Sequence, residues 1–287
     1  MPIYVARDSV EMWTTPELFL VNEKGEVSTV AGVPPDVFSE DGQYWGNPLY
    51  DWEYMNHTDY KWWIHRMRES FKLYDAVRID HFRGFESYWE IPFGSETAAT
   101  GEWKLGPGAR LFHKIKKELG DLNIIAEDLG YITDEVRAMR EDTGFPGMKV
   151  LQNGFSGTDS LDLPHHYGKN TVAYVGTHDN PTALDWYLNF ASAEQQNQAD
   201  LYLARCSDEH ISDALNREIA ASQSTIAIYV MQDLLHLNKE GRMNTPSTIG
   251  GNWGWRMSKA AITTEVKEKL RQWTQTYFRL NEPFSRK

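Results

Sequence analysis

Three acidic residues could do chemistry, because each follows a short apolar run and has polar neighbours. They are Asp80 in RIDH (78–81), Glu127 in AEDLG (126–130) and Asp179 in GTHDN (176–180). In a barrel of parallel strands, the carboxyl ends of different strands converge on one face. Cleavage of a glycosidic bond needs an acid for the leaving oxygen and a carboxylate near the anomeric carbon. This pattern therefore favours an enzyme that processes glycans.

The elements that must position these residues are buried strands alternating with helices. Apolar, β-branched runs predict the strands, and apolar residues at helical spacing predict the helices. We expect strands at 2–5, 75–79, 122–126, 148–151, 171–175 and 224–230, and helices at 58–72, 109–119, 133–142, 192–204, 208–221 and 264–281. Alternation of this kind predicts an α/β fold with a parallel sheet covered by helices.

The fold class that fits best is a (β/α)8 barrel of the TIM type, but an incomplete one. About six of the eight strand-helix units are found, and two loop-rich insertions are expected near 14–57 and 83–108. We expect residues 1–287 to be a single catalytic-barrel domain. A Ser192 and Gln195 capping box and Thr133 ahead of two acidic residues mark the starts of two of the helices.

Each acidic residue has a functional and a structural interpretation. Arg78 lies two residues before Asp80, on the same side of the strand, and would keep it ionised as a nucleophile requires. A purely structural ion pair is the alternative. Asp128, directly after Glu127, would help raise the pKa of a general acid, or it could simply cap the following turn.

Asp179 could accept hydrogen bonds from sugar hydroxyls, with His178 as an added donor. A Ser/His/Asp triad is set aside because the sequence has no G-x-S-x-G turn. A zinc site at His178 and Asp179 lacks further ligands at suitable spacing, so no metal is expected.

Composition excludes several classes of partner. The net charge is −12, and the longest basic cluster, Lys114 to Lys117, has the spacing of a solvated helix face, so no nucleic-acid partner is expected. No apolar run is long enough to span a membrane. One cysteine, Cys206, cannot form an internal disulfide, which favours a reducing, cytoplasmic setting. The eleven Trp residues could stack on pyranose rings or fill the core.

The sequence resembles the 4-α-glucanotransferases, also called amylomaltase or disproportionating enzyme, of glycoside hydrolase family 77 in the α-amylase superfamily. Besides the three acidic segments, the resemblance includes PIYVARDS (2–9), GVPPDVFSEDGQYWGNPLY (32–50), NTPST (244–248) and GNW (251–253). The 32–50 segment is the most specific, since related amylases share the acidic segments.

The resemblance implies a role for each matching residue. Asp80 would be the nucleophile, Glu127 the general acid/base and Asp179 the transition-state stabiliser. The substrate-binding residues would be Arg78, His81, His178, Asp36, Tyr44, Trp45, Pro246 and Asn252. No cofactor is implied, and the partners would be α-1,4-glucans such as maltodextrins.

The implied reaction is a retaining transfer of glucan segments, with the two catalytic carboxyl groups roughly 5–5.5 Å apart. Two rival functions stay open: an α-glucan hydrolase of the same superfamily, and a catalytically silent glucan-binding module. Family members have an upstream region that supplies the first barrel strands. We therefore expect a fragment of a longer gene product; alternatives are a barrel closed by a partner chain, such as the missing N-terminal part, and poor folding alone.

Overall fold

The computed structural model describes residues 1–35, 40–157, 160–246 and 248–280. The backbone separates into two compact units, Met1–Gly147 and Met148–Lys287. In the described part of the chain, no helix has both the length and the apolar character that a membrane span requires.

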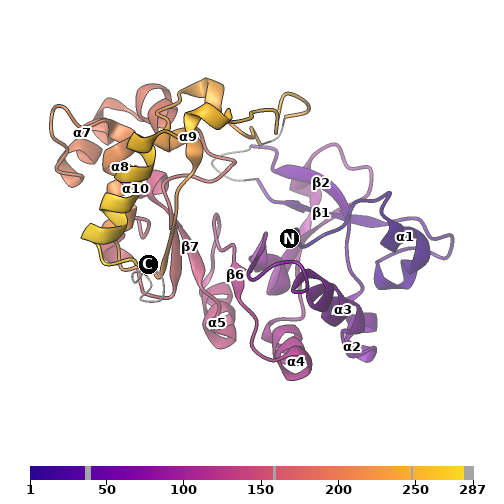
Figure 1. Ribbon diagram of the computed structural model, residues 1–287. Coiled ribbons are helices and arrows are strands. Elements are labelled where there is room, and N and C mark those ends of the chain that lie inside the picture. The colour runs from indigo at the N-terminus through magenta and orange to yellow at the C-terminus, as the bar shows by residue number, and fades with distance from the viewer. Residues whose placement is uncertain (36–39, 158–159, 247, 281–287) are drawn as a thin grey trace. The chain divides into compact units, whose positions relative to one another are not determined.

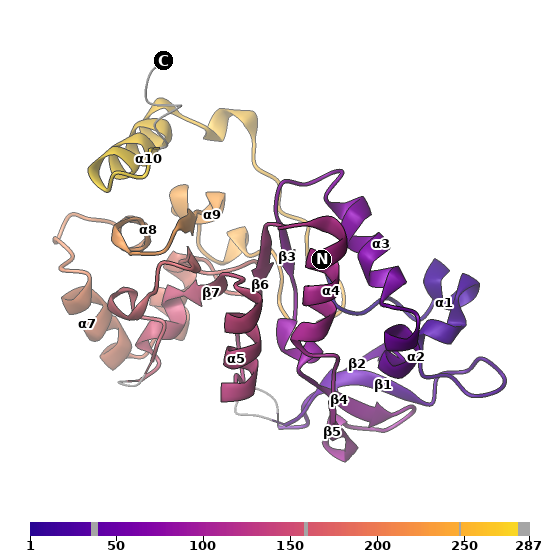
Figure 2. The ribbon, with the colours of Figure 1, turned by 90° about the horizontal axis from the view of Figure 1, so that it is seen from below.

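The first unit combines a small antiparallel sheet with a pair of parallel strands and their helices. Its strands are β1 (Thr29–Val33), β2 (Gln43–Pro48), β3 (Val77–Ile79), β4 (Ser87–Pro92), β5 (Glu102–Leu105) and β6 (Ile124–Ala126). Its helices are α1 (Val10–Thr14), α2 (Trp52–His57), α3 (Lys61–Ser70), α4 (Ala109–Leu119) and α5 (Asp134–Thr143). Helix α4 lies between α3 and α5 (Figure 2).

The antiparallel sheet was missed by the sequence analysis, which expected loop-rich insertions near 14–57 and 83–108. The strand order is β2-β1-β4-β5, so strands from both insertions pair with each other. Figure 1 shows β1 and β2 side by side, joined in an antiparallel ladder that is interrupted between Val30 and Gly32. These strands are short and rich in Gly, Pro and Trp, and their partners come from distant segments, so local periodicity gave little signal.

Residues 2–5 do not form the predicted strand. The carbonyl oxygen of Ile3 accepts a hydrogen bond from the Tyr50 hydroxyl at 2.8 Å, and the Arg66 guanidinium donates to the carbonyls of Ile3 and Pro2. Ile3 and Tyr4 are nevertheless buried. The apolar character of the segment was therefore recognised correctly, but its carbonyl groups at Pro2 and Ile3 accept hydrogen bonds from side chains and not from a neighbouring strand.

The parallel pair β3–β6 is supported by a large apolar core. Trp63 on α3 is fully buried, as are Phe82 and Phe85 in the 3-10 turn η2 (Phe82–Phe85), which follows β3 after two residues. Burying one such ring stabilises a fold by roughly 2–3 kcal/mol. The turn after β3 is therefore anchored to the core by its own buried phenylalanines, Phe82 and Phe85.

The second unit is organised around β8 (Thr171–Tyr174), which lies between β7 (Gly147–Val150) and β9 (Ile226–Ile228) in a three-stranded sheet. Strands β8 and β9 are parallel. The helices are α6 (Ala183–Asp185), α7 (Ala193–Tyr202), α8 (Ile211–Ala221), α9 (Met231–Leu234) and α10 (Thr264–Thr276), with a π-helical turn at Trp186–Phe190. Helix α8 contacts both α9 and α10 (Figure 1).

Five of the six predicted strands and all six predicted helices have counterparts in the structure. The capping box at Ser192 and the N-cap at Thr133 are confirmed.

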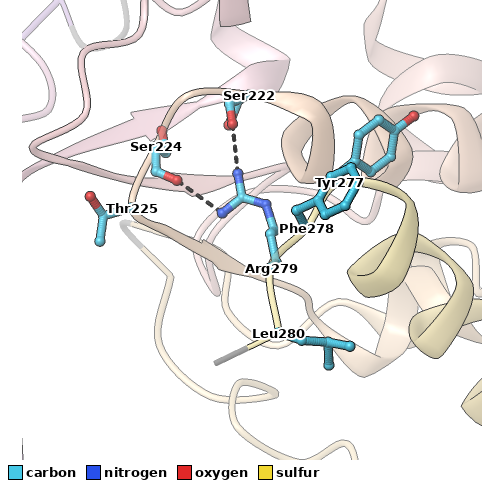
Figure 3. A pocket seen from close by; sticks show the side chains of 7 residues that line it. All are labelled: Ser222, Ser224, Thr225, Tyr277, Phe278, Arg279 and Leu280. Atoms are coloured by element: carbon cyan, nitrogen blue, oxygen red, sulfur yellow. Dashed lines mark hydrogen bonds between the residues drawn. The ribbon is translucent and has the colours of Figure 1, made fainter. Parts of the chain in front are cut away.

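A hollow of about 330 Å³ next to the end of α8 is lined by polar groups that already bind each other. Arg279 donates to the carbonyl oxygens of Ala220 at 2.6 Å, Ser222 at 2.7 Å and Ser224 at 2.9 Å. Figure 3 shows its guanidinium directed at Ser222 and Ser224. Because helix ends leave carbonyl groups unpaired, we interpret Arg279 as a cap of α8.

Candidate active site

The structure brings two of the three acidic residues to the same ends of neighbouring strands. In the parallel β3–β6 pair, Ile79 lies opposite Ala126, so Asp80 and Glu127 are the first residues beyond the paired ends. The amide of Glu127 donates to the carbonyl of Ile79 at 3.0 Å, which continues the ladder to this point. Strand pairing therefore fixes the relative position of the two acidic residues.

Asp80 forms an ion pair with Arg78. The guanidinium Nη2 lies 2.7 Å from Oδ1 of Asp80, and the side chains are 24% and 50% exposed, respectively. A charge-assisted hydrogen bond of this length orients the carboxylate, and half of the Asp80 side-chain surface stays exposed.

Glu127 is held by backbone amides. The amide of His81 donates to Oε2 at 2.6 Å, and the amide of Leu129 donates to Oε1 at 3.0 Å. Burial, and secondarily the negative charge of Asp80, raise the pKa of Glu127 to about 7, although the two hydrogen bonds act in the opposite direction. A carboxyl group with this pKa can give and take a proton near neutral pH.

His81 connects the acidic pair to an aromatic cluster. It adopts a left-handed backbone conformation, with φ of 53°, in the turn after β3. Burial, and secondarily the positive charge of Arg83, lower the pKa of His81 to about 3, so its ring is neutral. The Trp45 ring on β2 meets the His81 ring edge-on with centroids 4.7 Å apart.

Tyr44 and Trp45 are 38% and 37% exposed. The Tyr44 hydroxyl accepts a hydrogen bond from the Gly94 amide at 3.2 Å, and the Trp45 indole donates to Gln43 at 3.1 Å. Both rings are thus fixed by hydrogen bonds while part of their surface remains available. Asp36, the remaining predicted substrate-binding residue of the 32–50 segment, lies outside the described residues.

In the second unit, Asp179 lies in the loop that follows β8. Asn244 Nδ2 donates to Oδ1 of Asp179 at 2.6 Å, and His178 Nε2 is 3.2 Å from Oδ2. Arg242 donates to the backbone carbonyl of Asp179 at 3.1 Å, so both the main chain and the side chain are positioned.

The C-terminal end of the same loop, at Pro181 and Ala183, is held by two further hydrogen bonds. The amide of Ala183 donates to Oδ1 of the buried Asp233 at 2.7 Å, and Gln152 donates to the carbonyl of Pro181 at 3.0 Å. Burial raises the pKa of Asp233 to about 6. Together with the contacts of Arg242, these bonds fix the loop along most of its length.

Pro246 and Asn252 lie in one loop of the second unit. Asn252 Oδ1 accepts from the Thr245 amide at 3.0 Å, and its Nδ2 donates to the Thr248 hydroxyl at 3.0 Å. Pro246 is exposed. The side chain of Asn252 therefore closes the loop on itself. Among the described residues, no group of three or more His, Cys, Asp or Glu side chains could hold a metal ion.

Comparison with known proteins agrees with these motifs. A family model described as 4-alpha-glucanotransferase matches residues 1–263. The chain is 56% identical over 283 residues to the 4-alpha-glucanotransferase of Streptococcus pneumoniae serotype 4. The aligned region covers 98% of this chain and 56% of that relative. The chain belongs to the 4-alpha-glucanotransferase family.

Other members of the 4-alpha-glucanotransferase family match this chain over a similar share of its length. The enzyme of that name from Clostridium butyricum is 46% identical over 281 residues, covering 97% of this chain and 58% of the relative. The amylomaltase from Streptococcus agalactiae, solved in complex with acarbose, matches with a TM-score of 0.95 at 47% identity, covering 98% of this chain and 57% of that chain. The chain thus has the α/β, TIM-barrel-type fold of amylomaltase, and it spans a little over half the length of these relatives.

Sequence reasoning about this 4-alpha-glucanotransferase-family chain missed Asn244 and Arg242, which contact Asp179. Asn244 opens a segment that carried the resemblance, so the signal was present in the sequence. It is 65 positions from Asp179, however, and spacing alone does not reveal such a contact.

Proposed function

We propose that the chain carries the catalytic residues of a 4-α-glucanotransferase that transfers α-1,4-glucan segments between maltodextrins. One observation supports this most directly. Asp80 and Glu127 follow the paired ends of adjacent parallel strands, one beside a guanidinium and the other with a pKa raised to about 7. Such a pair provides a charged nucleophile and a protonated acid at the same pH.

The proposed mechanism is a double displacement with retention. A carboxylate oxygen of Asp80 attacks the anomeric carbon while Glu127 protonates the departing glycosidic oxygen, and a glycosyl-enzyme forms. Glu127, now ionised, then takes the proton from the 4-hydroxyl of an acceptor glucan, whose oxygen displaces Asp80. For this mechanism we expect the carboxyl groups of Asp80 and Glu127 to be roughly 5–5.5 Å apart in the competent site.

Asp179 is the proposed transition-state stabiliser. The contacts from Asn244, His178 and Arg242 fix its orientation before substrate arrives, which is what electrostatic stabilisation of a transition state requires. Arg78, His81 and His178 are proposed to contact the donor glucose.

The partly exposed rings of Tyr44 and Trp45 are proposed to stack on sugar and to keep water from the glycosyl-enzyme, with Asp36, Pro246 and Asn252 as further substrate-binding residues. The named activity of the relatives and the acarbose complex of the Streptococcus agalactiae amylomaltase support an α-glucan substrate.

We also propose that this chain supplies part of a single catalytic-barrel domain, predicted as about six of its eight strand-helix units with five of those strands formed in the structure, and that the remaining part of the domain completes it. The expectations of a cytoplasmic setting, no cofactor, and neither nucleic-acid nor membrane partners stay predictions.

The experiment that tests the function uses a chimera, because the relatives are longer than this chain. The 287 residues replace the matching stretch of the Streptococcus pneumoniae relative, and the chimera is incubated with maltotriose. We expect glucose and longer maltodextrins. Glucose and maltose without longer products would instead identify a hydrolase, and a folded chimera without turnover would overturn the proposal.

The nucleophile is tested in the same chimera by Asp80→Ala, which should lower maltotriose turnover by at least about 1,000-fold. The matched control is Asp75→Asn, an exposed aspartate just before the same strand, which should leave turnover unchanged. Turnover retained by Asp80→Ala would remove Asp80 from the mechanism.

A further inference from the structure

Trp253 combines a large exposed ring with an unusual backbone. The residue is 53% exposed, and its φ is 60°, in the left-handed region. Bulky residues rarely adopt this conformation, because their Cβ atom approaches the following carbonyl oxygen. Such backbone conformations persist where surrounding contacts hold them, and they concentrate at functional sites.

The contacts that hold Trp253 come from its own loop. Its amide donates to the carbonyl of Met243 at 2.7 Å, and its carbonyl accepts from Arg256 Nη1 at 2.8 Å. The preceding residue, Asn252, ties the loop to Thr245 and Thr248. These bonds fix the backbone from which the indole projects.

The ring lies one side chain away from the proposed transition-state stabiliser. The Trp253 and His178 rings have centroids 5.0 Å apart at an angle of 39°, and His178 Nε2 is 3.2 Å from Oδ2 of Asp179. The backbone around this contact is also tied together, since the Asn244 amide donates to the carbonyl of His178 at 3.1 Å. An exposed apolar surface therefore borders a cluster of hydrogen-bonding groups.

Such a surface matches the two-sided chemistry of a glucosyl ring. A pyranose presents C–H groups on its face and hydroxyl groups around its edge, so it can stack on an indole while polar side chains bind its hydroxyls. Trp13 is more exposed, at 84%, but it is on the short helix α1. Of these two tryptophans, Trp253 is the one that combines exposure with a ring contact to a histidine beside a carboxylate.

We propose that Trp253 is a sugar-stacking residue, which binds a glucosyl unit of an α-1,4-glucan beside the unit reached by Asp179. The proposal rests on the proposed function for the identity of the ligand. A role limited to supporting His178 is the competing explanation, because the two rings are in contact.

Direct binding tests the proposal without requiring turnover. The chimera carrying Asp80→Asn is titrated with maltoheptaose by calorimetry, and the same titration is repeated with Trp253→Ala, Trp253→Phe and Ile249→Ala added. We expect Trp253→Ala to weaken binding about 10-fold and Trp253→Phe to restore it to within about threefold, since stacking is worth about that much. Ile249, fully exposed in the same loop, is the matched control and should have no effect.

Kinetics in the active chimera separates binding from support of His178. Loss of stacking should raise KM for maltoheptaose while kcat changes little, whereas displacement of His178, which lies beside Asp179, should lower kcat. Unchanged binding in Trp253→Ala, equal losses in Ile249→Ala, or a change in kcat alone would each overturn the proposal. The two proposals can fail separately. If the chimera without substitutions shows no turnover, the proposed function is refuted. If Trp253→Ala still weakens maltoheptaose binding in that case, the stacking role stands.

Discussion

Replacing Glu127 with Gln should abolish catalysis and yet make the stability of the fold less sensitive to a rise in pH from mildly acidic to neutral values. The substitution keeps the size of the side chain and one acceptor oxygen. It removes the group whose ionisation is opposed by burial and by the charge of Asp80. Stability as a function of pH therefore reports on the environment of the proposed acid, independently of any activity assay.

The magnitude follows from the shift in pKa. In the unfolded chain the carboxyl has its ordinary pKa of 4.5, and in the folded chain the pKa is about 7. Between these values the unfolded state loses its proton first, so the wild type loses stability as pH rises through this window and no further above it. At about 1.4 kcal/mol for each pH unit, the loss is roughly 3 kcal/mol.

The assay is urea unfolding of the wild type and Glu127→Gln across this range of pH. The variant can accept only one of the two backbone hydrogen bonds, from His81 or from Leu129, at every pH, so the informative quantity is the change in the stability difference. We expect the variant to gain roughly 3 kcal/mol relative to the wild type between about pH 4.5 and about pH 8. Glu53→Gln, at an exposed position on α2, is the control and should show no such trend.

A second variant tests the cause. Because the charge of Asp80 is the second contribution to the raised pKa, adding Asp80→Asn to both the wild type and Glu127→Gln should narrow their pH-dependent stability difference without removing it. A difference that stays flat across the pH range would refute the reasoning, since it would mean that Glu127 titrates as it does in water.

Two further predictions concern Trp45 on β2 and the end of α8. Trp45→Ala in the active chimera should raise hydrolysis relative to transfer severalfold, because the ring beside His81 is proposed to exclude water; an unchanged ratio of glucose to longer products would argue against this role. Arg279→Ala should lower the free energy of unfolding by about 1–3 kcal/mol, since it leaves carbonyl groups at the end of α8 unpaired. Urea midpoints would measure the loss, and Arg271→Ala, at an exposed position on α10, provides the control.

Local signals allowed much of the helical structure and one part of the site to be predicted from the sequence. Helix α4 begins and ends at the predicted residues, because its apolar stripe and the glycines at both ends are local features. The proximity of Asp80 and Glu127 also followed, since both end apolar runs that could pair as parallel strands.

Features that depend on distant pairing could not be predicted in this way. The sheet β2-β1-β4-β5 joins β1 to β4, whose paired residues Thr29 and Pro92 are far apart in the sequence. The contact of Asn244 with Asp179 spans 65 positions. No periodicity encodes either contact, because tertiary packing alone decides which of many polar or short extended segments meet.

The hydrogen bonds to Glu127 come from main-chain amides, and this affects which substitutions the sequence can accept during evolution. Side chains at 81 and 129 can be exchanged without removing the donors, provided the replacement tolerates the local backbone. At position 81 the left-handed conformation narrows the choice to residues such as Asn, Asp or Gly. Variation at these positions should therefore leave both donors to Glu127 in place, whereas loss of the His81 ring removes its contact with Trp45 and its proposed contact with the donor glucose.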